Sequence, residues 1–178
     1  MILLDKFKPT WMVNSIYAVA PDQLKERGIR AVFSDLDNTL IAWNNPDGTP
    51  ELREWMTRLR EAGIPLIVIS NNSKDRVAKA TANLDLPFVS RSLKPLSFGI
   101  NRARAKLGLK KSEVVMVGDQ LMTDMVAANE AGVRSILVKP LLDTDKWDTR
   151  INRFFERIVW RKLRKKNPQL QWREDLND

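Results

Sequence analysis

Two aspartates separated by a single residue, Asp35 and Asp37, carry the clearest chemical signal in the sequence. They follow the apolar run of residues 31–34 (AVFS), where a buried strand should end. If the backbone stays extended there, both carboxylates point the same way, because side chains alternate along a strand. Two anions beside an apolar strand are costly without a cation. A divalent metal that prefers oxygen ligands, such as Mg²⁺, would neutralise them.

Further polar side chains follow the later apolar runs of the chain. They are Ser70, Asn71, Lys94, Asp119 and Asp124. In a sheet of parallel strands, ligands bind beyond the carboxyl ends of the strands, so these residues are expected at one edge. Carboxylates, one ammonium group and the N-termini of helices together suit Mg²⁺ and a phosphate group.

The elements that would position these residues alternate between strands and helices. Repeated units of this length predict parallel strands joined by right-handed crossovers. The expected fold is α/β: a three-layer α/β/α, Rossmann-like domain with a central parallel sheet. Apolar runs predict strands, and apolar residues at helical spacing predict helices. The expected strands are 29–36, 64–69, 88–90, 113–117 and 135–138, and the helices are 51–62, 73–84, 97–107 and 122–131.

The chain divides into three parts on this pattern. Residues 1–29 form an apolar-rich arm that is expected to pack on the core and to contain a short helix over 21–28; an exposed membrane or partner contact is the alternative. Residues 30–142 form the catalytic domain. Residues 143–178 form a basic, amphipathic helix and a tail.

The composition excludes several kinds of chemistry. The 178 residues include no cysteine, which excludes disulfides, zinc–thiolate sites and cysteine nucleophiles. They include no histidine, so acid–base chemistry must use carboxylates, lysine, tyrosine or a metal-bound group. We find no pattern typical of a signal peptide or a membrane span. The expected location is the cytoplasm, with peripheral association at the inner face of the membrane as a further hypothesis.

The polar residues at the expected strand ends match four motifs in order. Together they resemble the haloacid dehalogenase (HAD) superfamily of phosphatases, and their details resemble its capless IIIA group, in particular the YqeG-like branch. That branch is similar to the phosphatidylglycerophosphate phosphatases. Motif I corresponds to residues 35–39 (DLDNT), motif II to Ser70, motif III to Lys94-Pro95 and motif IV to residues 118–124 (GDQLMTD).

The resemblance implies roles for the four acidic residues. Asp35 would be the nucleophile that becomes an aspartyl phosphate. Asp37 would protonate the leaving alkoxide and then act as the base for the attacking water. Mg²⁺ would be held by Asp35, the backbone carbonyl of Asp37 and Asp119, with Asp124 as a further carboxylate, directly or through water.

The resemblance also implies how the phosphate is held. Ser70 and Lys94 would bind the phosphoryl oxygens, and Asn71 would help them, although Asn71 could instead only shape the turn. Catalysis would then rest on positioning and charge neutralisation, as expected for phosphoryl transfer.

The spacing of the motifs leaves no room for a cap domain. Only 30 residues separate Leu40 from Asn71, and one loop, one helix and one strand account for them. A site without a cap is open, which favours a large or membrane-anchored phosphate ester over a small metabolite that must be enclosed.

The function that follows is a Mg²⁺-dependent phosphomonoester hydrolase. The resemblance favours removal of the terminal phosphate from phosphatidylglycerophosphate in phospholipid synthesis. Two alternatives stay open: a phosphatase of soluble nucleotides or sugar phosphates, and an RNA- or ribosome-associated binding protein with a HAD-like fold.

The positive charge of the chain is concentrated near its C-terminus. The formal charge of the whole chain is +8, and residues 146–166 contain nine Lys or Arg and two acids. Such a segment needs an acidic partner, for which an anionic membrane surface is the first hypothesis and RNA the second.

Helical spacing over residues 143–166 places the basic side chains along one ridge and two apolar rows along another face. One row is Trp147, Ile151, Phe154 and Ile158, and beside it lie Phe155, Val159 and Leu163. The apolar face predicts contact with a membrane interface or, equally, packing on the domain. Residues 167–178 are expected to be a polar, frayed end.

Overall fold

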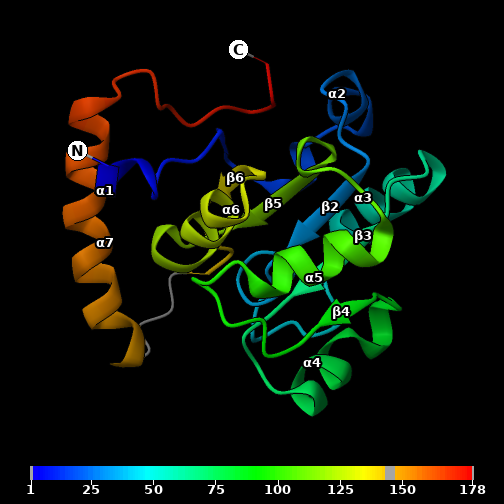
Figure 1. Ribbon diagram of the computed structural model, residues 1–178. Helices are drawn as coiled ribbons and strands as arrows, with labels where there is room; N and C mark the ends of the chain where they lie inside the picture. The colour runs from blue at the N-terminus through cyan, green and yellow to red at the C-terminus, as the bar shows by residue number, and fades with distance from the viewer. Residues whose placement is uncertain (1, 143–146, 178) are drawn as a thin grey trace.

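A parallel sheet of six strands forms the middle of the protein (Figure 1). The computed structural model describes residues 2–142 and 147–177, and the side chains of residues 3–142 and 153–177. The strand order is β1-β6-β5-β2-β3-β4, and every neighbouring pair is parallel. The strands are β1 (Trp11–Val13), β2 (Ala31–Ser34), β3 (Leu66–Ile69), β4 (Phe88–Val89), β5 (Val114–Gly118) and β6 (Arg134–Val138).

Helices cover both faces of this sheet, which confirms the three-layer α/β/α prediction. The α-helices are α1 (Ile2–Asp5), α2 (Pro21–Glu26), α3 (Pro50–Glu61), α4 (Lys74–Thr81), α5 (Phe98–Leu107), α6 (Val126–Ala131) and α7 (Trp147–Lys166). Short 3₁₀ turns are η1 (Ile16–Ala18), η2 (Ala82–Leu84) and η3 (Lys111–Glu113), and η4 (Leu121–Met125) is a single π-helical turn.

Alternation along the strands divides the core into two layers. On β2, Val32 faces the layer that contains Trp55 of α3, whereas Phe33 faces the layer that contains Ile100 of α5. Both neighbours of β2 are strands, so its side chains are buried on each face, as expected for a central parallel strand. This burial fixes the register of the strand that ends just before Asp35.

The helices begin and end where the sequence supplies the necessary backbone chemistry. Thr49 caps α3 by accepting a hydrogen bond from the Leu52 amide, and Pro50 occupies its first turn. Helices α5 and α6 both end at a glycine with positive φ, Gly108 and Gly132. These ends direct the chain back into β5 and β6.

The arm of residues 1–29 contributes a strand that the sequence analysis missed. Strand β1 pairs in parallel with β6, with Trp11 opposite Ile136 and Val13 opposite Val138. It is only three residues long and lies at the edge of the sheet, so its sequence carries too little alternation to indicate a strand. Five strands were predicted, and the sheet has six.

Helix α7 packs on the sheet through Val159 and Leu163, whereas Phe155 of the same row is exposed. Leu163 is completely buried in a cluster with Met12 and Leu137, and Val159 packs against that cluster. Phe154 and Ile158 belong to the other row and remain exposed. The side chains of the remaining members of that row, Trp147 and Ile151, lie outside the described residues. Within the described ranges, no helix is long and apolar enough to cross a membrane.

The prediction of a polar, frayed end over residues 167–178 is wrong. Arg173 forms a parallel bridge with Val13 and exchanges backbone hydrogen bonds with Met12 and Asn14. Leu170 and Leu176 are buried, and the ring of Trp172 packs on Trp160 of α7. The segment is ordered because it covers the exposed edge of β1, a pairing that its polar composition does not reveal.

The two apolar rows of α7 should differ in their effect on stability. We expect Leu163→Ala to lower the free energy of unfolding by about 2–5 kcal/mol, because it leaves a cavity in a buried cluster. Phe154→Ala removes a side chain that is 60% exposed, so it should change the free energy of unfolding by less than about 0.5 kcal/mol. Urea unfolding of both variants measures the difference, and equal losses would contradict this packing.

Candidate active site

The chain turns sharply as soon as β2 ends. The Asp35 amide still donates to the Val117 carbonyl, as in a strand. The amides of Leu40 and Ile41 then both donate to the Leu36 carbonyl, and Asn38 has a φ of 61°. The turn separates the two aspartates into different surroundings. Asp35 is partly buried, whereas Asp37 is exposed.

Asp35 and Asp37 therefore do not share one environment, although both line the same cavity. The expectation that they project together assumed an extended backbone, but β2 ends at Ser34. The Asp37 carboxylate instead accepts a hydrogen bond from the Asn72 side chain, with a distance of 2.9 Å between Nδ2 and Oδ2. This contact links the turn after β2 to the turn after β3.

Lys94 joins two of the acidic residues that the sequence predicted at this edge. Its Nζ donates to Asp35 Oδ1 at 2.8 Å and to Asp124 Oδ1 at 2.7 Å, and its side chain is almost completely buried. Burial lowers the pKa of Lys94, but the charges of Asp124 and Asp35 outweigh it and raise the pKa above its ordinary value. Lys94 is therefore a fixed positive charge beside Asp35.

The loop that carries Lys94 is held by Asn71. The Asn71 side-chain carbonyl accepts hydrogen bonds from the Lys94 amide and from the Ser92 hydroxyl, both at 2.8 Å. Its side-chain NH₂ group donates to the Lys94 carbonyl at 2.8 Å. Both the oxygen and the nitrogen of the Asn71 side chain therefore position Lys94. A direct role for Asn71 in phosphate binding stays a prediction.

Two glycines allow these loops to approach the sheet closely. A Cβ at Gly118 would lie 2.3 Å from Cγ of Asp124, and a Cβ at Gly99 would lie 2.5 Å from Cβ of Ser92. Neither position tolerates a side chain, because the neighbouring residues would have to move. Gly118 therefore makes room for Asp124, and Gly99 makes room for the loop that carries Lys94.

Asp119 completes a cluster of three carboxylates. Oxygens of Asp35, Asp119 and Asp124 lie within 4.8 Å of one another. The hydroxyl of Thr39 donates to Asp119 at 3.2 Å. Burial, followed by the charges of Asp35 and Asp124, raises the pKa of Asp119 well above its ordinary value. The ionised form of Asp119 is therefore destabilised by its surroundings.

Asp124 is the most buried member of this cluster. Burial raises its pKa to about 6, the Lys94 ammonium opposes that effect, and the charge of Asp35 adds to it. The second oxygen of the carboxylate accepts a hydrogen bond from the amide of Gln120, the residue just before η4. At neutral pH, Asp124 and Lys94 therefore form a buried ion pair with its polar atoms occupied.

The acidic cluster has the donor set of a hard divalent cation. The Lys94 ammonium contacts two of the three carboxylates, Asp35 and Asp124, so the cluster contains more acidic groups than cations. A group of oxygen ligands with excess negative charge favours Mg²⁺ or a similar cation over softer metals. Asp35, Asp119 and Asp124 therefore fit the magnesium site that the resemblance implied.

Ser70 directly follows β3 and lines the same cavity as Asp35. Its side chain is buried, and its hydroxyl accepts a hydrogen bond from the Asn72 amide at 3.2 Å. A cavity of about 250 Å³ opens in front of these groups. The predicted residues that line it are Asp35, Asp37, Ser70, Asn71 and Lys94.

Several residues of this cavity were not predicted from the sequence. They are Asn38, Trp43, Asn72, Arg76, Gln120 and Thr123. Gln120 and Thr123 belong to motif IV, and their hydrogen bond to each other at 3.0 Å holds the turn before Asp124. Arg76 lies in α4 and carried no signal, because a single arginine on a charged helix is most often solvated.

Comparison with known families identifies the fold and the catalytic class. A model of the hydrolases described as haloacid dehalogenase-like matches residues 3–132. This chain is a haloacid dehalogenase-like hydrolase. The family that the four motifs predicted is therefore confirmed.

Two relatives refine this assignment. The probable phosphatase YqeG of Bacillus subtilis (strain 168) is 39% identical over 168 residues, which cover 94% of this chain and 97% of that protein. The resemblance to the YqeG-like branch is thus confirmed. Phosphatidylglycerophosphate phosphatase 1 of Arabidopsis thaliana is 31% identical over 142 residues, which cover 75% of this chain but only 41% of the relative.

A solved structure supports the fold alone. NagD from Escherichia coli K-12 superposes with a TM-score of 0.52 over 62% of this chain and 87% of its own chain, at 16% identity. This hydrolase therefore shares its fold with that solved structure.

Crowded carboxylates should destabilise the hydrolase when no metal is bound. A carboxyl whose pKa is raised by folding contributes stability below its ordinary pKa of 3.8 and loses it as the pH rises through the folded value. We expect Asp119→Asn to raise the melting temperature at pH 7 in a chelator. A gain of 1 kcal/mol corresponds to about 2–4 °C in a chain of this size.

The same substitution should abolish stabilisation by Mg²⁺, because it removes a predicted ligand. Thermal scans with chelator and with Mg²⁺ measure both effects. Asp85→Asn, on the opposite side of the sheet from the cluster, is the matched control and should behave as the native chain does. A lower melting temperature for Asp119→Asn in chelator would contradict the charge crowding.

Proposed function

We propose that this hydrolase is a Mg²⁺-dependent phosphomonoesterase that removes the terminal phosphate from phosphatidylglycerophosphate and yields phosphatidylglycerol. The observation that carries the proposal is the contact of Lys94 with both Asp35, which lines the cavity beside it, and the buried Asp124. It places a fixed positive charge beside a carboxylate that faces a space large enough for a phosphate group.

Asp35 is the nucleophile in this mechanism. Lys94 holds one of its oxygens, which restricts rotation of the carboxylate and leaves the other oxygen to attack phosphorus. A bond forms between Asp35 and phosphorus while the bond from phosphorus to the alkoxide breaks. Water then attacks the aspartyl phosphate, and free Asp35 and inorganic phosphate are released.

Asp37 moves the protons of both steps. It gives a proton to the departing alkoxide and later takes one from the attacking water, so that it ends the cycle in the protonated state in which it began. Its exposure on the turn after β2 lets it reach the outer side of the cavity, and the hydrogen bond from Asn72 fixes its direction. The turn thus separates the acid–base group from the nucleophile.

The bound phosphate is negatively charged, and the site must compensate for this charge. Mg²⁺ held by Asp35, Asp119, the Asp37 carbonyl and Asp124 would supply positive charge to the phosphoryl oxygens. The Ser70 hydroxyl and the Lys94 ammonium would bind the same oxygens from the protein side. Arg76 lies on the cavity wall and adds a further positive charge.

The lipid substrate is supported by the relatives and by the shape of the site. Two of the relatives named above are a probable phosphatase and a phosphatidylglycerophosphate phosphatase. The described residues between β2 and β3 form one loop and α3, and Asp37 stays exposed. An open site suits a phosphate group whose remaining substrate stays outside the protein.

A substrate panel with Mg²⁺ tests the proposal. We expect phosphatidylglycerophosphate in mixed micelles to be hydrolysed with a higher kcat/KM than sugar phosphates or nucleotides. Asp35→Asn should lower kcat by a factor of 10⁴ or more, on the order of what loss of a nucleophile causes, without changing the far-UV circular dichroism. Preference for a soluble ester would reject the lipid substrate, and full activity of Asp35→Asn would reject the mechanism.

The basic face of α7 provides the membrane contact in this proposal. Arg157, Arg161 and Lys165 are exposed and lie four residues apart, so that they point to one side of the helix. Each Lys or Arg near an anionic surface contributes about 1 kcal/mol. This face therefore favours a surface of anionic lipid.

Neutralising this face should weaken binding to anionic vesicles. We expect the triple variant Arg157→Gln, Arg161→Gln and Lys165→Gln to bind vesicles of equimolar phosphatidylcholine and phosphatidylglycerol roughly 100-fold more weakly. Sedimentation with the vesicles measures the effect.

The matched control neutralises three exposed cations elsewhere on the protein: Lys25, Arg60 and Lys106. It loses the same charge and should bind the vesicles almost as the native chain does. Equal losses in the two variants would mean that net charge, not α7, drives binding. Binding to single-stranded RNA in preference to the vesicles would reject the membrane contact.

A further inference from the structure

Four large apolar side chains are exposed on the segments after β2 and β4 that also carry residues of the active site. Trp43 is 65% exposed, Leu93 55%, Leu96 62% and Phe98 55%. Trp43 lines the cavity itself, and the other three belong to the loop and helix start that follow β4 and carry Lys94. We call these four residues the apolar rim. Large exposed apolar side chains on the segments that carry a functional site require a reason, whereas single ones scattered over a surface do not.

The rim is rigidly held, because its loop is tied to the turn after β3. The Arg91 amide donates to the Asn72 carbonyl, and the Ser92 amide donates to the Ser70 carbonyl, both at 2.9 Å. The Leu96 amide then donates to the Leu93 carbonyl at 2.8 Å. The hydrogen bonds that hold the catalytic lysine thus also hold the rim.

The same loop forces Leu93 outward. Its neighbours Ser92 and Lys94 are both buried and point into the protein. Leu93 itself has a φ of 61°, a conformation that glycine or asparagine adopts at lower cost than leucine. An exposed leucine in this conformation gains nothing for the fold, which indicates that its side chain serves a contact outside the chain.

Cationic side chains accompany the rim. Arg76 lines the cavity together with Trp43, and Arg91 is exposed two residues before Leu93. Tryptophan and leucine beside arginine are the side chains that occupy the boundary between lipid headgroups and acyl chains, where apolar groups enter the bilayer and guanidinium groups bind phosphates. The combination therefore matches a lipid surface in both charge and polarity.

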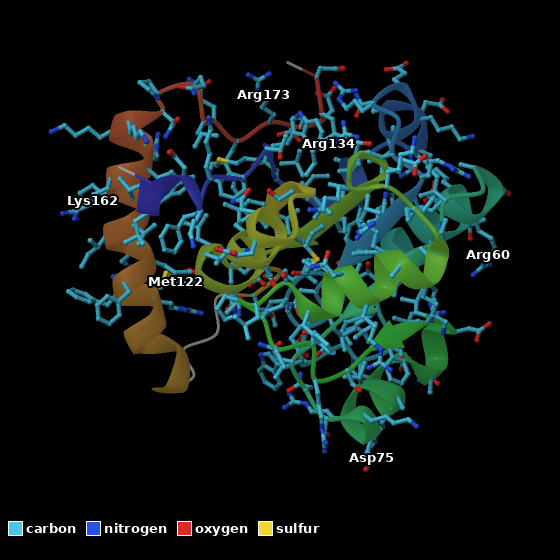
Figure 2. All side chains as sticks on the ribbon, viewed as in Figure 1. Arg60, Asp75, Met122, Arg134, Lys162 and Arg173 are labelled. Carbon is cyan, nitrogen blue, oxygen red and sulfur yellow. The ribbon has the colours of Figure 1, made fainter. Side chains whose placement is uncertain are left out.

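Helix α7 contacts the same edge of the sheet. Glu156 accepts a hydrogen bond from the Met122 amide in η4, the turn that carries Asp124, and Figure 2 shows Met122 beside this helix. Phe154 and Phe155, which directly precede Glu156, are exposed at 60% and 51%. The basic helix and the rim thus both adjoin the loops of the active site.

We propose that the apolar rim is a lipid-contact surface, which enters the bilayer interface beside the active site and brings Asp35 to the phosphate of a lipid. The acyl chains of the substrate would then remain in the bilayer while only its headgroup enters the cavity. This inference rests on the proposed function for its substrate, but binding of the rim to a bilayer can be measured without catalysis.

The test compares rim variants with a control on the same helix. The rim variant is Leu96→Gln with Phe98→Gln, and a second is Leu93→Asn, which suits the positive φ. The control, Leu107→Gln, removes an exposed leucine at the opposite end of α5. Sedimentation uses equimolar phosphatidylcholine and phosphatidylglycerol vesicles at high salt, which screens the charges of α7.

We expect the double rim variant to bind the vesicles about tenfold more weakly or worse, because two large apolar side chains no longer enter the interface. The kcat/KM of this variant for phosphatidylglycerophosphate in vesicles should fall together with its vesicle binding. Its hydrolysis of a soluble aryl phosphate should stay unchanged. Leu93→Asn should shift binding in the same direction, and Leu107→Gln should match the native chain in all three measurements.

Other outcomes reject the inference. Unchanged vesicle binding by both rim variants, or no vesicle binding by the native chain, would overturn it. An equal loss of kcat/KM for the soluble aryl phosphate would mean that the rim supports the structure of the active site and does not contact lipid. Vesicle binding that depends on the rim, without hydrolysis of phosphatidylglycerophosphate, would support the rim while rejecting the proposed substrate.

Discussion

The buried ion pair between Lys94 and two aspartates is the constraint on which the active site depends. A lysine ammonium is stable at this depth only because Asp35 and Asp124 both accept its hydrogen bonds. The hydrogen bond from Lys94 in turn fixes the orientation of the Asp35 carboxylate, on which the proposed chemistry of the site depends. It also joins β2, the loop after β4 and the π-helical turn η4 into one unit at the carboxyl edge of the sheet.

This unit needs its loops to approach more closely than ordinary packing allows. Gly118 leaves space for the Asp124 carboxylate, and Gly99 leaves space for Ser92 in the lysine loop. Asn71 then connects the lysine loop to the turn after β3 through both ends of its amide. Precise positioning of this kind suits phosphoryl transfer, in which the protein mainly orients groups and compensates charge.

The active site and the segments around it differ in polarity. The partly or fully buried cluster contains carboxylates and an ammonium group, whereas the segments after β2 and β4 expose the side chains of Trp43, Leu93 and Leu96. A substrate with a phosphate headgroup and apolar chains has the same division of polarity. The rim and the basic face of α7 would then place the polar cluster at the surface of a bilayer, where such a substrate resides.

The sequence by itself determined the layered α/β fold, the family and the identity of the acidic residues, because strand periodicity and motif order are local patterns. Only the tertiary structure decided which acids share Lys94, since that contact joins residues 59 and 30 positions apart. It also showed β1, the ordered C-terminal segment and the exposed row of α7. Edge pairing and burial depend on distant partners, and no local pattern records them.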